Sequence, residues 1–305
     1  MSGLHLPETS HPNGEAKAQY DALIGIDAQK QQLLDELSML LDEVRLGKWL
    51  KKHHSKGLPM ARGLKGGAPL VLLSGEVGCG KTVLANSVGT PLSRLVDKKI
   101  VTMATPSNIR GQGLVGELST RVTAAFEQAR ARVRDRKNYG LLIIDEADDL
   151  ASARDQMQAH HEDRAGVNVL IKEMDTIMRE NVPLAVLMIT NRVHALDPAI
   201  VRRAALHLQF DRPTAKQRRA VFERLLEGTD HGPDELTKLV MATRPKELVP
   251  YSFSDLVVRL GKTALRQAVR EDRPFGAEVL LNVVTHLAPS PLVENRLSEE
   301  VHSDA

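Results

Sequence analysis

The sequence predicts an α/β fold in which a parallel sheet is sandwiched by helices and is followed by a small all-helical domain. Residues 70–73, 139–144 and 184–189 are apolar almost throughout, as strands buried on both faces of a parallel sheet are. Residues 99–104 add another strand, and helical spacing between the strands predicts the crossover helices that such a sheet requires. From residue 213 onward, apolar residues recur only at helical spacing.

The chain before the first of these strands shows three kinds of segment. Residues 1–19 are polar with prolines and a glycine, and we expect a flexible lead-in. An apolar turn at residues 20–27 leads into apolar spacing that predicts an amphipathic helix from Asp27 to about Leu46. Residues 45–67 hold seven Lys or Arg side chains and no acidic one. This basic segment is either a solvated loop or a surface for a polyanion or an acidic partner.

The first apolar strand runs into a glycine-rich turn of the pattern G-x-x-x-x-G-K-T, placed directly before a helical segment. Its residues are Gly75, Glu76, Val77, Gly78, Cys79, Gly80, Lys81 and Thr82, followed by Val83. The glycines let successive N–H groups point into one concavity that holds phosphate oxygens. Lys81 is expected to reach the β- and γ-phosphates, and Thr82 to ligate Mg²⁺. The pattern therefore predicts a nucleoside triphosphate site.

Two carboxylates, Asp145 and Glu146, follow a buried strand, and Asn191 follows the next one. Ligands of parallel sheets lie at the carboxyl ends of the strands, where the glycine-rich loop is also expected. Asp145 can hold Mg²⁺ opposite Thr82, and Glu146 can polarise a water for attack on the γ-phosphate. The two acids could instead cap the next helix, but the loop upstream argues against that interpretation.

Together with the sequence Leu196–Arg203, these motifs resemble the AAA+ ATPases in kind and in order, over roughly residues 20–288. The resemblance implies ATP as the nucleotide, an ATPase activity, and a P-loop NTPase sheet. It also implies that the turn with Ile24 and Gly25 lies beside the adenine and that Asn191 fixes the attacking water. Either Arg202 or Arg203 would be an arginine finger that reaches the neighbouring subunit's nucleotide, which implies a homohexameric ring.

Within that family, the stretch from Asp145 to Arg154, residues 162–168 and residues 197–204 are similar to the pachytene-checkpoint remodellers, which act on HORMA-domain proteins. In those proteins a loop after the second strand pulls substrate through the pore. The matching positions here are Leu114 and Val115, and the usual aromatic residue is missing. The short amino-terminal segment resembles compact bacterial members found beside nucleotide-cyclising anti-phage systems.

The AAA+ resemblance also divides the chain. We expect a large α/β ATPase domain at residues 20–212, a small helical lid domain at residues 213–288 and a disordered tail at residues 289–305. The sequence Ser252–Leu256 resembles the lid turn of AAA proteins that lack a second sensor arginine. Arg259 is the nearest basic residue and reads as a solvated helix charge.

Composition and the carboxylate motif argue against two other functions. A formal net charge of +2 and only three Tyr, one Trp and five Phe argue against a nucleic-acid motor or loader that stacks bases. An ATP-dependent scaffold without hydrolysis is disfavoured because Glu146 is present. The sequence shows no signal peptide and no membrane span, and its single cysteine suits a reducing compartment, so we expect a cytoplasmic protein.

Overall fold

The computed structural model describes residues 4–54, 56–64, 68–106, 109, 116–149, 161–245 and 249–293. The chain divides into two compact units. The first, here called the large unit, comprises Met1–Ala22, Ala28–Ser74 and Thr82–Gln209. The second, called the lid unit, comprises Leu23–Asp27, Gly75–Lys81 and Phe210–Ala305. The glycine-rich loop thus groups with the helical region rather than with the sheet.

A six-stranded sheet in the order β1-β3-β4-β5-β2-β6 forms the centre of the large unit. Its strands are β1 (Glu8–His11), β2 (Leu70–Gly75), β3 (Lys99–Ala104), β4 (Asn138–Ile144), β5 (Leu184–Thr190) and β6 (Leu206–Phe210). The pairs β3–β4, β4–β5 and β5–β2 are parallel, whereas β1 pairs antiparallel with β3. The predicted α/β fold is confirmed, with the predicted parallel pairing in the centre of the sheet and, at β1, an antiparallel edge strand that the sequence did not predict.

The register places the ends of β2, β4 and β5 at one edge of the sheet. Ser74 of β2 lies opposite Thr190 of β5, and Ile144 of β4 lies opposite Met188. Asp145, Glu146 and Asn191 therefore follow the strands at the same edge. This arrangement is the one that the sequence predicted from the polar residues after each apolar run.

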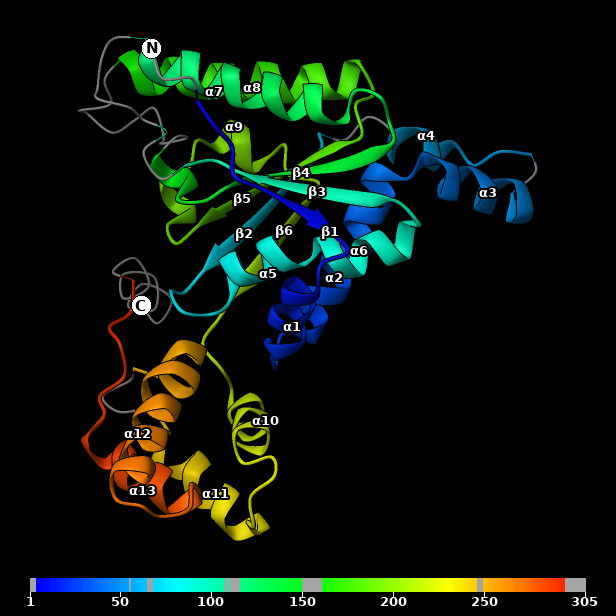
Figure 1. Ribbon diagram of the computed structural model, residues 1–305. Coiled ribbons are helices and arrows are strands. Elements are labelled where there is room, and N and C mark those ends of the chain that lie inside the picture. The colour runs from blue at the N-terminus through cyan, green and yellow to red at the C-terminus, as the bar shows by residue number, and fades with distance from the viewer. Residues whose placement is uncertain are drawn as a thin grey trace, which may run out of the picture. The chain divides into compact units, whose positions relative to one another are not determined.

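Helices cover both faces of the sheet, with α7 and α8 on one face and α5 and α6 on the other (Figure 1). Alternate residues of the central strands pack against α7 and α8, and the residues between them are buried as well. The helical elements of the large unit are α1 (Gly14–Ala22), α2 (Asp27–Leu41), α3 (Glu43–His53), α4 (Pro59–Leu64), α5 (Lys81–Ser87), α6 (Gly89–Val96), α7 (Glu117–Val133), η1 (Ala147–Asp149), α8 (His161–Arg179), η2 (Val193–Ala195) and α9 (Pro198–Val201).

The amino-terminal segment, expected to be a flexible lead-in, contains β1 and α1. The imidazole of His11 is buried and hydrogen bonds to the hydroxyls of Thr90, at 2.8 Å, and Thr102, at 3.1 Å. Asn13 accepts the N–H of Ala16 and so caps the start of α1. Strand pairing and a buried polar anchor, rather than an apolar pattern, order this segment.

The first part of the basic segment is helical. The sequence had not decided between a solvated loop and a binding surface for this segment. The helix expected from Asp27 to Leu46 ends at Leu41, because the Asp42 carboxylate accepts the N–H of Arg45 and begins a new helix, α3. Side chains that face away from Leu46 and Leu50 on α3 are exposed: Arg45, Lys48, Trp49, Lys52 and His53.

In the described part of the chain, no helix is long and apolar enough to cross a membrane.

The lid unit is built from helices, as predicted. They are α10 (Ala215–Leu225), α11 (Pro233–Ala242), the π-helical segment η3 (Asp255–Gly261), α12 (Lys262–Arg270) and α13 (Ala277–His286). A capping box of Thr214 and Gln217 begins α10. Tyr251, Phe222 and Leu256 are among the fully buried residues of its core. Residues 289–293, predicted to belong to a disordered tail, lie among the described residues.

Candidate active site

The glycine-rich loop has the backbone that its sequence predicts. Gly75, Gly78 and Gly80 have φ angles of +120°, +73° and +90°, in a region that residues with a Cβ rarely adopt. Space is also short, because a Cβ at Gly75 would lie 2.2 Å from the carbonyl oxygen of Phe210. Glycine is therefore required at this position on two independent grounds.

Lys81 begins helix α5, and its ammonium group is held against the loop. Nζ donates to the carbonyl oxygens of Gly75, at 2.8 Å, and Glu76, at 2.7 Å. The residue is 5% exposed. The one cation of the motif thus lies beneath the curl of backbone that phosphate oxygens would occupy.

The variable positions of the loop differ in their surroundings. The Glu76 carboxylate is buried and accepts from Nε of Arg212 at 3.1 Å. Burial raises the pKa of the Cys79 thiol to about 11, with the Lys81 ammonium opposing the shift. Val77 and Val83 are exposed. Sequence reasoning assigned Glu76 to the nucleotide through the loop pattern alone and missed its pairing with Arg212.

The turn with Ile24 and Gly25 lies against the lid helices. Gly25 has a φ of +78°, and its carbonyl oxygen accepts from Nε2 of Gln217 at 2.6 Å. Ile24 packs against the apolar core of the lid unit. The lid turn also contacts the loop, because the N–H of Ser254 donates to the Gly78 carbonyl at 2.9 Å.

In the large unit, the side-chain oxygens of Thr82 and Asp145 lie within hydrogen-bonding distance of each other. Oγ1 of Thr82 donates to Oδ2 of Asp145 at 2.9 Å, while Oδ1 accepts the N–H of Glu146 at 2.9 Å. A hydroxyl and a carboxylate at this separation fit Mg²⁺, which takes one or two protein oxygens beside phosphates and water. Glu146 is exposed and has a φ of +51°.

A network that sequence reasoning missed lies next to these residues. The Asp148 carboxylate accepts from the hydroxyl of Thr190 at 2.7 Å and from Nε of Arg192 at 2.9 Å. It joins the turn after β4 to the end of β5, on either side of the exposed Asn191. The D-E-x-D spacing after the strand was the available signal. This network links the end of β5 to the turn after β4, beside both Glu146 and Asn191 in the sequence.

The two candidate fingers follow α9, whose start is capped by the Asp197 carboxylate. Nη1 of Arg203 donates to the carbonyl oxygen of Ala199 at 3.2 Å, and the side chain is partly buried. Arg202 is exposed, and within the described residues no hydrogen bond or ion pair holds its guanidinium. Of the two, Arg202 has the side chain that is available to another molecule.

Leu114 and Val115, assigned to the pore loop, lie outside the described residues. Arg259 is not simply a solvated charge, because Nη1 pairs with the buried Asp255 carboxylate and donates to the Ala288 carbonyl at 3.1 Å. From the sequence, Arg259 was judged by its position on a helix alone, and that position does not show that the carboxylate one turn away is buried.

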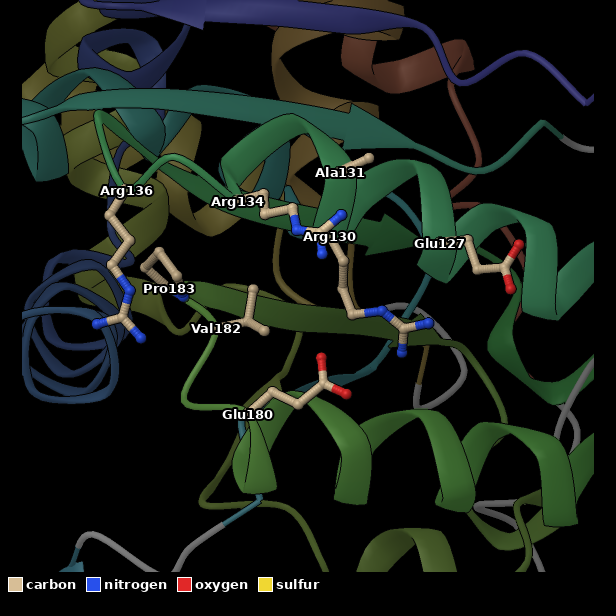
Figure 2. Close-up of a pocket in the computed structure, with 8 residues that line it drawn as sticks. All are labelled: Glu127, Arg130, Ala131, Arg134, Arg136, Glu180, Val182 and Pro183. Atoms are coloured by element: carbon tan, nitrogen blue, oxygen red, sulfur yellow. The ribbon is translucent and has the colours of Figure 1, made fainter.

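A pocket of about 370 Å³ elsewhere in the large unit is not part of this site (Figure 2). It is lined by Glu127, Arg130, Ala131, Arg134, Arg136, Glu180, Val182 and Pro183. These residues come from the carboxyl-terminal half of α7, the turn between α7 and β4, and the turn between α8 and β5. The pocket therefore lies at the opposite edge of the sheet from Asp145 and Asn191.

Comparison with known proteins gives consistent matches. The family described as "ATPase family associated with various cellular activities (AAA)" matches residues 71–212. CD-NTase-associated protein 6 of Escherichia coli (strain MS 115-1) is 36% identical over 297 residues, which cover 93% of this chain and 94% of the relative. Its counterpart in E. coli strain KTE188 is 33% identical over 287 residues, covering 92% and 95%.

Solved structures of related proteins also match this chain over most of its length. A chain of the E. coli MS115-1 HORMA:CdnC:Trip13 complex matches with a TM-score of 0.88 at 35% identity, covering 94% of this chain and 97% of the other. Rhizobiales Trip13 matches with a TM-score of 0.75 at 31% identity, covering 93% and 98%. C. elegans PCH-2, at 19% identity and a TM-score of 0.68, covers 94% and 76% and supports the fold alone.

Proposed function

The chain belongs to the AAA family of ATPases, with CD-NTase-associated protein 6 among its relatives, and we propose that it hydrolyses ATP in order to remodel a folded HORMA-domain protein. The observation that carries the proposal is the arrangement of Thr82, Asp145 and Glu146 at the sheet edge. Supporting it are the loop conformation and the position of Lys81.

In the proposed reaction the loop from Gly75 to Lys81 binds the phosphates of ATP through its N–H groups and the Lys81 ammonium. Thr82 and Asp145 would hold Mg²⁺, which neutralises charge on the phosphates when it is bound. Glu146 accepts a proton from the attacking water, and Asn191 orients that water. Asp148, through Thr190 and Arg192, keeps the two strand ends in register.

The choice of substrate rests on the relatives. A chain of similar length and fold occurs in a complex described as HORMA:CdnC:Trip13, and the similarity extends over nearly the whole of both chains. We therefore propose a HORMA-domain protein as the substrate and a nucleotide-cyclase anti-phage system as the setting. Leu114 and Val115 are proposed to grip the substrate chain in the pore of a homohexamer.

Glu146→Gln tests the catalytic assignment. The variant keeps the size of the side chain but removes the base, so it should bind ATP while hydrolysis falls by about 10² to 10⁴. Lys81→Ala should lose ATP binding as well, because it removes the cation of the loop. ATP turnover by Glu146→Gln at the wild-type rate would refute the assignment.

A further inference from the structure

The lid unit contains a buried ion pair that connects the phosphate-binding loop to the carboxyl-terminal end of the described chain. The Arg212 and Glu76 side chains are 3% and 4% exposed. Beyond Glu76, the Arg212 guanidinium donates to the carbonyl oxygens of Pro250, Ser290 and Pro291. Four acceptors around one buried guanidinium leave little freedom for any of them.

Residues 287–291, here called the strap, follow α13 without regular secondary structure and are held largely by hydrogen bonds. Oδ2 of Asp255 accepts from the N–H of Ser290 at 3.1 Å and from its hydroxyl at 2.7 Å. The Leu287 carbonyl oxygen accepts from the Tyr251 hydroxyl, and that of Ala288 accepts from Arg259. Hydrogen bonds therefore hold the strap both at Ser290 and Pro291, where it meets Arg212, and before them at Leu287 and Ala288.

Asp255 remains ionised although it is buried. Burial opposes ionisation of its carboxyl, but hydrogen bonds from the Ser252 N–H, the Arg259 guanidinium and Ser290 outweigh it and lower the pKa to about 2. The anchor of the strap is thus a full negative charge at neutral pH. An ionised acceptor makes stronger hydrogen bonds than a neutral one.

From these contacts we infer that the strap positions the phosphate-binding loop, with Arg212 as the positioning residue that passes the constraint to Glu76. The strap carbonyls hold the guanidinium at the place where it meets the Glu76 carboxylate. The Glu76 carbonyl oxygen in turn accepts the Lys81 ammonium. Removing the strap would free Arg212, then Glu76, and so loosen the loop that presents Lys81. The inference rests on the proposed binding of ATP to this loop.

The test compares two shortened chains. One ends at Leu287 and lacks most of the strap, while the matched control ends at Val293 and keeps it. We measure ATP affinity by calorimetry and the hydrogen exchange of amides 75–81 without nucleotide. The chain ending at Leu287 should bind ATP about tenfold more weakly, equivalent to about 1.4 kcal/mol, and exchange these amides faster. The control should match the full chain in both measurements.

A double-mutant cycle separates positioning from a general loss of stability. Glu76→Gln should weaken ATP binding in the full chain but add little in the chain ending at Leu287, because the connection is already broken there. Additive effects of the two changes would overturn the inference. Arg212→Lys, which keeps the charge but has only three N–H donors for the four acceptors of Arg212, should also speed exchange in the loop.

The readouts also separate this inference from the proposed function. If the full chain binds no ATP, the proposed function is wrong, and loop exchange still decides whether the strap acts on the loop. If ATP binds but the chain ending at Leu287 matches the control in affinity and exchange, the strap has no positioning role.

Discussion

Glu146 occupies the left-handed region of backbone conformation, which is uncommon for a residue with a side chain. The Asp145 carboxylate accepts its N–H on one oxygen and the Thr82 hydroxyl on the other. Backbone conformations of this kind cluster at functional sites, where the surrounding structure maintains them. The D-E pair identified these residues from sequence, but the conformation that aims Glu146 depends on contacts across 63 positions of the chain.

Cys79 is expected to be unreactive although it lies in a phosphate-binding loop. Burial raises its thiol pKa to about 11 from the ordinary 9.0. At pH 8 the thiolate fraction is then about 0.1%, compared with about 10% for an exposed thiol. Iodoacetamide should therefore modify native Cys79 at least about 100-fold more slowly than the same chain in urea. Equal rates for the two, followed by mass spectrometry, would show that the loop does not bury this thiol.

Other residues of the site could not be found from the sequence. Glu76 stands at a variable position of the loop motif, and its partner Arg212 lies 136 positions further along the chain. Asp148 and Arg192 likewise meet only because β4 and β5 are neighbours in the sheet. A sequence motif shows the residues that contact phosphate, whereas the residues that hold the motif in place are brought together by tertiary structure.

At the scale of elements, the apolar strands and amphipathic helices were predictable and the short polar elements were not. β3, β4 and β5 follow the predicted ranges closely, because continuous burial leaves a continuous apolar pattern. β1 is a four-residue edge strand with exposed polar side chains, so its pattern carries no such signal. The break between α2 and α3 depends on the Asp42 cap, which apolar spacing across the junction obscured.

His11 makes the attachment of β1 sensitive to pH. Burial lowers its pKa from 6.5, so the folded protein resists a proton that the unfolded chain accepts below that pH. This residue's contribution to stability is therefore present at pH 7 and decreases as pH falls below about 6.5. Thermal unfolding should lose more stability between pH 7 and pH 5.5 in the wild type than in His11→Gln. An identical loss in both proteins would mean that His11 titrates freely.

At the scale of the whole molecule, the proposed ring requires a residue that acts across subunits. Arg202 is exposed, whereas Arg203 donates to the carbonyl oxygen of Ala199 in the preceding helix α9, so we expect Arg202 to be the finger. Arg202→Ala should keep ATP binding and lose about 10³ or more in turnover, with a smaller effect for Arg203→Ala.

Mixing experiments test whether that arginine acts in trans. Arg202→Ala subunits have an intact Glu146, and Glu146→Gln subunits have an intact Arg202. Neither variant should hydrolyse ATP alone, but a mixture should recover part of the activity, because some interfaces then combine both intact residues. If the mixture stays inactive while each variant binds ATP and assembles, or if Arg202→Ala alone is active, the assignment of a trans-acting finger to Arg202 fails.

The sequence predicted the glycine-rich loop, the two carboxylates and the helical lid, because each of these parts has a recognisable pattern of its own. The proposed substrate rests on family resemblance and on the solved complex of a related chain, which is described as HORMA:CdnC:Trip13. We propose that ATP hydrolysis by this chain changes the fold of a HORMA-domain protein.

That claim is tested most directly by hydrogen exchange of a HORMA-domain protein from the same organism, incubated with this chain. With ATP and the wild type, amides of the HORMA core should lose protection at substoichiometric enzyme. With ADP, or with Glu146→Gln and ATP, protection should remain as in the HORMA protein alone. Unchanged protection in the presence of the wild type, under conditions where ATP is being hydrolysed, would contradict the proposed remodelling activity.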